Sequence, residues 1–160
     1  MPRRPAATPQ SPDWQTLLHA SGLRVTPATV TVLGILHQAP AALTHEELFN
    51  AYARCAGAPP DKVTLYRILD RLVSASLCDK LPGTDRVTRF TLHANTSGHV
   101  FECSSCHKLL PLPDDPELPA ALDRLGKALK RRGIQTSESS VTLRGTCSDC
   151  AHDHDGNGSS

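Results

Sequence analysis

The sequence has few aromatic residues, almost no net charge and no long apolar run. One Trp, two Tyr and three Phe in 160 residues argue against binding single-stranded nucleic acid by base stacking. A formal net charge of +1 provides no overall field that would attract a polyanion. Without an apolar stretch of about 20 residues or an apolar segment behind the basic start, neither a membrane span nor a secretion signal is expected. We therefore predict a reduced, cytoplasmic protein with no membrane partner.

Charge is distributed unevenly between the two halves of the chain. Residues 1–80 carry eight Lys and Arg against six Asp and Glu, whereas residues 81–160 carry nine against ten. Any contact with nucleic acid must therefore use a local surface in the first half. The length allows one medium domain or two small ones.

Signatures of common metalloenzymes and redox enzymes are also missing. His45-Glu46 begins an H-E-x-x-H pattern, but Phe49 stands where the second His would be, which excludes a zincin. The H-x-E and P-C-x-x-C motifs of zinc deaminases are absent. A thioredoxin-like redox pair would need a βαβ context that is not present. We predict that the protein is not an enzyme.

Four of the six cysteines form two C-x-x-C pairs, Cys103 with Cys106 and Cys147 with Cys150. Each pair places two sulfurs on one tight turn, and two such turns supply the four thiolates of a closed tetrahedral Zn²⁺ site. Two disulfides or four unrelated thiols are the simpler alternatives. Cys103 to His107 also reads C-S-S-C-H, the pattern for c-type haem attachment, which would require export and leave the second pair unexplained. We therefore predict a structural zinc held by all four cysteines.

Helix start signals recur through the first half of the chain. Trp14 begins a short helix, and Thr26-Pro27 supplies an N-cap followed by a first-turn proline. Thr44 to Glu47 is a capping box, and Asp61 can cap a further helix. Cys55 follows the capping box at helical spacing and is expected in the core.

The last of these helices has two faces. Leu65, Leu69 and Leu72 form its buried stripe, whereas Tyr66 and Arg67 lie on the opposite face. A segment with strand character on both sides of a Pro-Gly turn follows and predicts a hairpin. Three helices followed by a hairpin outline a winged helix-turn-helix, in which this last helix would enter the major groove.

The rest of the chain is expected to form a second unit. We predict a winged-helix domain over residues 13–93, a hinge over 94–98 and a small α/β domain over 99–151, in which strands lead into both C-x-x-C pairs. Disordered tails are expected over residues 1–12 and 152–160. The expected fold class is α+β, with a winged helix-turn-helix followed by a small α/β domain that contains the Cys₄ zinc site.

Three motifs are shared with a known family: Gly22-Leu23-Arg24-Val25-Thr26, the segment Val63-Thr64-Leu65-Tyr66-Arg67-Ile68-Leu69, and the two C-x-x-C pairs. From about residue 14 to residue 150 the chain resembles the Fur family of metal-responsive transcriptional repressors. The resemblance implies a homodimer, a winged helix on DNA and a second unit that serves as the dimerisation domain. It also implies a regulatory metal site at the hinge, separate from the structural zinc.

The resemblance also implies positions for the regulatory ligands. In zinc-sensing members, often called Zur, they come from the first hairpin strand, the end of the second strand and the segment before the first C-x-x-C pair. These positions correspond to Asp79, His93 and His99. His93 stands where relatives usually carry Cys, and Pro111 stands where a fourth ligand, often Glu, is found.

The fourth regulatory ligand is therefore open. A thiolate such as Cys78 would complete a tetrahedron suited to zinc. The other candidates are Glu102, His107, Asp114 and Glu117.

Iron- and peroxide-sensing relatives differ in two places. They carry several His and Asp before the first C-x-x-C pair, where this chain has Asn95-Thr96-Ser97-Gly98-His99. They also carry a His in the last strand, where this chain has Ser139. These departures favour zinc sensing over iron sensing.

Five residues are expected to contact double-stranded DNA. Tyr66 would touch a thymine methyl and Arg67 a guanine edge or a phosphate, while Arg24, Lys62 and Thr64 would anchor phosphates. The simpler alternative is that Tyr66 packs against the hairpin and that Arg67 is solvated. Dimer symmetry predicts a palindromic operator, and the family resemblance implies that it is A·T-rich.

The predicted function is a zinc-dependent, sequence-specific repressor of genes for zinc uptake and homeostasis. A metal that binds the DNA-competent hinge angle better than the open one would shift the population toward it. A Fur-type repressor that senses iron or another metal is the first alternative. A zinc-knuckle interaction protein without a DNA target is the alternative from another class.

Overall fold

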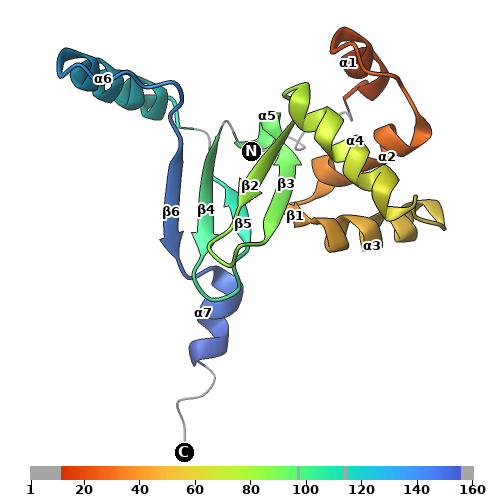
Figure 1. Cartoon of the computed structure of the whole chain (residues 1–160). Helices are drawn as coiled ribbons and strands as arrows, with labels where there is room; N and C mark the ends of the chain where they lie inside the picture. The colour runs from red at the N-terminus through yellow and green to blue at the C-terminus, as the bar shows by residue number, and fades with distance from the viewer. Residues whose placement is uncertain (1–11, 97, 114, 156–160) are drawn as a thin grey trace, which may run out of the picture.

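The computed structural model describes residues 12–96, 98–113 and 115–155. Within these ranges, a helical half that ends in a hairpin is followed by a second small sheet with its own helices (Figure 1). The expected N-terminal tail lies almost entirely outside the described residues, as do residues 156–160. No helix in the described ranges is both long and apolar enough to cross a membrane.

Each helix of the first half begins at a side-chain cap. The helices are α1 (Trp14–Ala20), α2 (Pro27–Gln38), α3 (His45–Ala56) and α4 (Lys62–Ser74). Asp13, Thr26 and Asp61 accept backbone N–H bonds at the starts of α1, α2 and α4. Thr44 and Glu47 make both bonds of a capping box at the start of α3. The three start signals predicted for α2, α3 and α4 are therefore confirmed.

These helices share one apolar core with the hairpin. Strands β1 (Leu43–Thr44), β2 (Cys78–Pro82) and β3 (Thr88–Leu92) form an antiparallel sheet in the order β1-β3-β2. Burial of apolar side chains is the main force that holds such a unit together. The buried core consists of Leu18, Val32, Leu33, Ile35, Leu36, Leu48, Tyr52, Leu65, Ile68, Leu69, Leu72, Cys78, Phe90 and Leu92.

One residue expected in this core is not there. Cys55 is exposed, so the prediction that it is buried was wrong. The buried positions of α3 are Leu48 and Tyr52. The helix ends at Ala56, one residue after Cys55, and Gly57 then turns the chain with a φ of 78°. Helical spacing alone did not reveal that Cys55 lies beyond the end of the packed surface.

The second sheet combines an antiparallel and a parallel pair. Its strands are β4 (His99–Cys103), β5 (Leu109–Pro111) and β6 (Val141–Gly145), in the order β5-β4-β6. Strand β5 is antiparallel to β4, and β6 is parallel to it. A parallel pair needs a crossover connection, which here contains α6 (Glu117–Arg131). Helix α6 extends away from the helical half (Figure 1), and none of its residues is buried.

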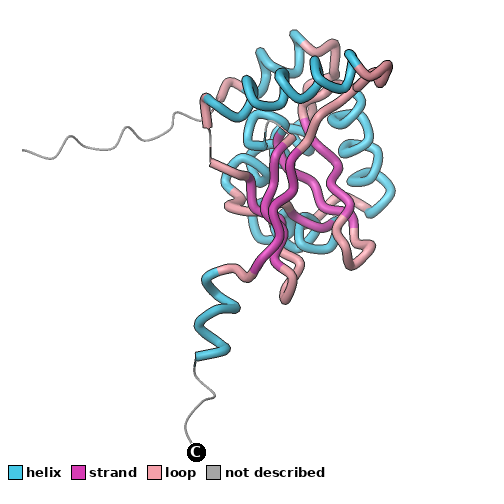
Figure 2. The backbone as a smooth tube through the Cα atoms, turned by 90° about the vertical axis from the view of Figure 1, so that its left-hand side faces the viewer, coloured by secondary structure: helices cyan, strands magenta, loops and turns pink. Residues whose placement is uncertain are grey.

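Two helices lie at the ends of the second unit. The short helix α5 (His93–Thr96) occupies part of the segment expected as a hinge. Helix α7 (Ser148–Asp155) begins directly after Cys147 and carries the chain away from the strands (Figure 2). This helix continues through Asp155, into the segment expected as a tail from residue 152.

The two sheets pack directly against one another. The backbone N–H of Ala42 donates to the carbonyl of Leu109 at 2.9 Å. Ala42, Val100 and Leu109 form a small buried cluster, and Leu81 of the hairpin packs against it. The hairpin thus lies between the helices and the second sheet (Figure 1), and this small cluster packs the junction between the two units.

Candidate metal centres and DNA-binding face

Both C-x-x-C pairs lie at the same end of the second sheet. In the parallel β4–β6 register, Cys103 stands opposite Gly145, two residues before Cys147. Ser104 N–H donates to Gly145 O at 2.7 Å, and Cys147 N–H donates to Cys103 Sγ at 3.4 Å. Because parallel neighbours end at the same edge, the topology brings together cysteine pairs that are far apart in sequence.

The four sulfur atoms all lie within 4.8 Å of one another. Sγ of Cys106 and Sγ of Cys147 are 3.7 Å apart. A tetrahedron with Zn–S bonds of about 2.3 Å has edges of about 3.8 Å. A disulfide would bring two sulfurs to about 2.05 Å, and all six cysteines of the chain are free. The arrangement therefore suits a tetrahedral thiolate-binding cation and excludes two disulfides.

The electrostatics of the cluster also favour a cation. The pKa of the Cys103 thiol is lowered, chiefly because the backbone N–H of Cys106 donates to its sulfur. The pKa of Cys150 is raised, first by its side-chain hydrogen bond with Cys147. Sulfurs this close cannot all become negative without mutual repulsion, which a divalent ion would remove. The residues present thus fit a zinc ion.

Two of the three residues expected to bind the regulatory metal meet at the junction of the units. His93 Nδ1 lies 2.8 Å from Asp79 Oδ1. The hydroxyl of Thr96 donates to the other carboxylate oxygen, Asp79 Oδ2, at 2.7 Å. Asp79 belongs to β2, whereas His93 and Thr96 belong to α5. The His93 side chain is 55% exposed and can meet a solvated ion.

His99 does not join this pair. Its Nδ1 accepts the backbone N–H of Val141 at 3.2 Å, which ties the starts of β4 and β6 together. Across the described ranges, only the four cysteines form a group of three or more potential ligands within reach of one ion. A third ligand from His99 would therefore require its ring to leave Val141.

Cys78, the thiolate considered as a fourth ligand, points into the helical core. It is 1% exposed, and burial raises the pKa of its thiol to about 12. Neighbouring strand residues point to opposite faces, so Asp79 and Cys78 lie on different sides of β2. This placement speaks against Cys78 as a ligand. Of the other candidates, Glu102 and His107 flank the first C-x-x-C pair, and Asp114 lies outside the described residues.

Glu117, the remaining candidate for the fourth ligand, opens α6. Its backbone N–H donates to Asp115 Oδ1 at 2.8 Å, so the two residues form a turn at the helix start. This contact is local and does not bring Glu117 into a group with Asp79 and His93.

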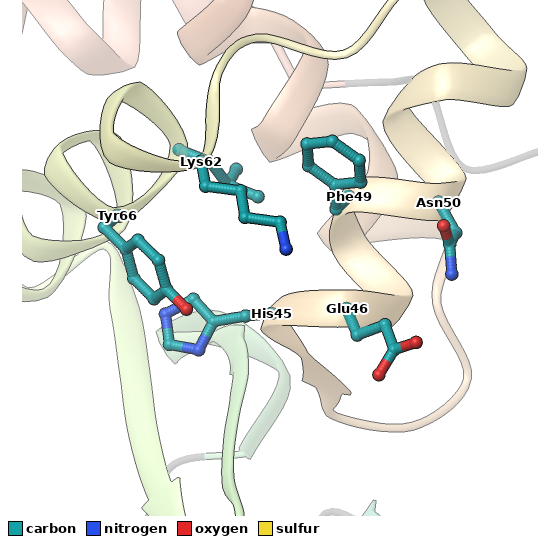
Figure 3. A pocket seen from close by; sticks show the side chains of 7 residues that line it. His45, Glu46, Phe49, Asn50, Lys62 and Tyr66 are labelled. Atoms are coloured by element: carbon teal, nitrogen blue, oxygen red, sulfur yellow. The ribbon is translucent and has the colours of Figure 1, made fainter.

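The exposed face of α4 adjoins the start of α3 (Figure 3). Lys62, Tyr66 and Arg67 are exposed, whereas the opposite stripe of α4 is buried as predicted. Lys62 and Tyr66 line a hollow of about 480 Å³ together with His45 and Phe49 of α3. The face offers two cationic groups and one aromatic ring, a set that can bind phosphates and base edges.

The Tyr66 ring packs against His45 at the start of α3. The ring centroids of Tyr66 and His45 are 4.1 Å apart, and those of His45 and Phe90 are 4.6 Å apart. His45 thus stands between α4 and β3. Burial lowers the pKa of His45, with a further contribution from Lys80, and both favour the neutral ring. In sequence His45 stood out as part of the capping box and of an incomplete H-E-x-x-H pattern, and helical periodicity does not reveal its contact with Tyr66.

The other residues expected to contact DNA differ in whether their side chains are free to bind a phosphate. The hydroxyl of Thr64 donates to Asp61 Oδ2 at 2.5 Å, and Thr64 N–H donates to Asp61 Oδ1 at 3.0 Å. A phosphate accepts hydrogen bonds, and the only hydroxyl proton of Thr64 is directed to Asp61. Arg24, in the loop before α2, and Arg67 are both exposed. The structure therefore places Thr64 in the helix cap and leaves the arginines on the surface.

The fold and the site residues can now be compared with known proteins. The sequence model of the ferric uptake regulator family matches residues 20–144. This chain belongs to that family. The transcriptional regulator FurA of Mycobacterium tuberculosis is 28% identical over 140 residues, which cover 88% of this chain and 91% of FurA.

Solved members of the ferric uptake regulator family share its fold. The ferric uptake regulator of Vibrio cholerae aligns with a TM-score of 0.65 and 22% identity, over 84% of this chain and 100% of the other. The structure of holo XcZur aligns with a TM-score of 0.56 and 26% identity, over 87% and 97% of the two chains. These alignments confirm the predicted α+β fold class.

Family membership also establishes the general activity. The chain is a metal-binding, DNA-binding transcription regulator that responds to metal, and it is not an enzyme. This confirms the predicted family and class of function. It also excludes the alternative of a zinc-knuckle protein that has no DNA target.

Proposed function

We propose that this protein is a zinc-dependent, sequence-specific repressor of genes for zinc uptake and homeostasis. The proposal is carried by the contact between Asp79 and His93 at the junction of the two units. A carboxylate and an imidazole are suitable zinc donors. The similarity of this chain to XcZur, with 26% identity, supports zinc as the sensed metal.

The regulatory ion would act on the packing of the two units. Asp79 lies on β2, and His93 directly follows β3. An ion bound to both residues would therefore join the two strands at the base of the hairpin. His99 would complete the site by leaving the N–H of Val141, at the first residue of β6. An ion that binds only this arrangement stabilises it by its differential affinity. An almost complete switch requires about 5.5 kcal/mol of that difference.

The second metal would have a structural role. Cys103, Cys106, Cys147 and Cys150 form a closed set of four thiolates, and closed Cys₄ sites are structural in most proteins. This ion would hold the ends of β4 and β6 together with the start of α7. It would remain bound when the regulatory ion is removed, because the two sites share no ligand.

The proposed partners are a second copy of this chain and double-stranded DNA. Leu125 of α6 and Leu143 of β6 are 57% and 53% exposed, an apolar surface that a homodimer would cover. Two-fold symmetry then implies a palindromic operator, which we expect to be A·T-rich. Tyr66 and Arg67 would read base edges, while Arg24 and Lys62 would contact phosphates.

Metal-dependent binding to DNA tests the sensing site. DNA selected by the protein from a random pool is titrated with wild type and His93→Ala, each without metal, with Zn²⁺ and with Fe²⁺. We expect zinc to tighten wild-type binding. His93→Ala should retain one tightly held zinc per subunit and lose the response, whereas the exposed His19→Ala should behave like wild type.

Two outcomes would change this conclusion. A His93→Ala protein that still tightens on DNA with zinc would refute the assigned site. A wild-type response to iron alone would favour the second candidate, an iron-sensing repressor, which the similarity to FurA and to the Vibrio cholerae regulator supports.

The recognition helix has a separate test. Tyr66→Ala should weaken binding to the selected DNA by about 1–3 kcal/mol, with little effect on random DNA, because it removes a base contact. Lys62→Ala should weaken both and reduce the salt slope by about one unit. Binding of both variants at wild-type strength would show that another surface reads the DNA. Zinc content and dimerisation serve as the control for folding.

A further inference from the structure

The tip of the hairpin lies against the first C-x-x-C turn. The backbone N–H and the hydroxyl of Thr84 both donate to Glu102 Oε1, at 2.7 and 2.6 Å. Thr84 Oγ1 also lies 3.3 Å from His107 Nδ1. Glu102 directly precedes Cys103, and His107 directly follows Cys106. The two residues that flank the cysteine turn therefore meet one residue of the DNA-binding unit.

The hydrogen-bond chemistry of this contact is well defined. A threonine hydroxyl has one proton, and that of Thr84 is directed to Glu102. The contact with His107 therefore requires a proton on Nδ1, which donates to Thr84. The residue Glu102 is only 3% exposed, and its second oxygen accepts Arg144 Nε at 3.3 Å. Glu102 is thus a buried carboxylate that accepts three hydrogen bonds. Because hydrogen bonds to charged groups are stronger than neutral ones, these bonds fix the position of the carboxylate.

Glu102 also connects both metal-binding turns. In the β4–β6 register it stands opposite Arg144, so each of the two residues lies just before the end of a strand that leads to a cysteine pair. Metal in the Cys₄ centre would hold these strand ends together, and with them the acceptor for Thr84. The hairpin is thus held at two places, at its base through Asp79 and His93 and at its tip through Glu102.

We propose that Glu102 is a positioning residue that fastens the hairpin of the DNA-binding unit to the Cys₄ centre, so that bound metal and hairpin placement stabilise each other. This inference rests on the proposed structural zinc. Coupling of this kind is reciprocal at equilibrium: if bound zinc stabilises the contact at the hairpin tip, that contact raises the affinity for zinc by the same factor. The contact can therefore be tested from either side.

The test compares Thr84→Val with Thr84→Ser in the full-length protein. The valine variant keeps the shape and removes the hydroxyl, and the serine variant keeps the hydroxyl. Loss of zinc to excess chelator and hydrogen exchange at the backbone amides of residues 83–86 are measured on the same samples. The exposed Thr142→Val, on the same strand as Arg144, is the matched control.

We expect Thr84→Val to bind a full complement of zinc and to release the Cys₄ ion about tenfold faster, in line with the loss of one hydrogen bond to a charged group. Exchange at residues 83–86 should accelerate by a similar factor. Thr84→Ser should restore both rates, and Thr142→Val should change neither. Glu102→Gln, which keeps the volume and removes the charge, should act in the same direction as Thr84→Val.

Unchanged zinc release and exchange in Thr84→Val would overturn the proposal. Equal effects of Thr84→Val and Thr142→Val would also overturn it, because general destabilisation would then explain both. Failure of the underlying metal assignment looks different: wild-type protein would then contain no zinc that survives mild chelation. His93→Ala separates the two sites, since it should leave release from the Cys₄ centre unchanged.

Discussion

The two halves of this molecule differ in what stabilises each of them. The helical half, with its hairpin, surrounds one continuous core of buried apolar side chains. The second unit shares a small buried cluster with the first half, and its helix α6 has no buried residue. A small unit without a large core needs another source of stability, such as a metal or a partner subunit. The comparison explains why four cysteines and an exposed apolar face occur in the same half.

The largest effect is expected from breaking the metal centre. Cys147→Ser should remove the structural metal and unfold the second unit, because the binding energy of such an ion, on the order of 10 kcal/mol, is also folding energy. The helical half should still melt cooperatively. Metal content, sedimentation and thermal unfolding check this, with the exposed Cys55→Ser as the control. Wild-type-like dimers of Cys147→Ser would contradict the comparison.

A core substitution should affect the helical half instead. Leu72 is 0% exposed within the apolar core, so Leu72→Ala should lower the free energy of unfolding of that half by about 2–5 kcal/mol. Zinc content should not change. Urea unfolding measures the difference, and Leu17→Ala, at a position that is 37% exposed, should cost much less. Loss of zinc from Leu72→Ala would show that the two halves do not differ in this way.

A charge on α6 should affect only association. Leu125 is 57% exposed, so Leu125→Glu should leave the fold of the single chain intact. In the proposed dimer it would bury a charge in an apolar contact and raise the dissociation constant about tenfold or more. Analytical ultracentrifugation over a concentration series checks this. Lys127→Gln, at an exposed position about 200° around α6 from Leu125, is the control, and equal dissociation constants of Leu125→Glu and wild type would exclude this face as the interface.

The smallest effect concerns pH in the helical half. The folded-state pKa of His45 is lowered, first by burial, while Lys80 lowers it and Asp70 raises it. The contribution of neutral His45 to the free energy of unfolding is complete above its ordinary pKa of about 6.5. It is lost as the pH falls toward the lower pKa of the folded state, because the unfolded chain binds the proton more readily. His45→Phe keeps an aromatic ring but removes the titratable nitrogens, so it should reduce the loss of stability between pH 7 and 5.5. If urea unfolding shows the same loss of free energy of unfolding for wild type and His45→Phe over this pH range, His45 does not have this role.

Local signals account for most of what could be predicted from sequence. Thr26, Thr44 and Asp61 cap helices through bonds to residues three positions ahead, so a few neighbouring residues determine each start. The C-x-x-C spacing likewise places two sulfurs on one turn. The family resemblance supplied Asp79 and His93, which the structure brings within 2.8 Å.

Sequence by itself thus determined the helix starts, the hairpin, the cysteine turns and the family. Tertiary structure alone decided which face of β2 carries Cys78, that His45 packs on Tyr66, and that Thr84 meets Glu102. Capping and turns depend on atoms within a few residues of one another, whereas these contacts join separate elements. No local pattern encodes them, since they exist only after the hairpin is packed between the helices and the second sheet.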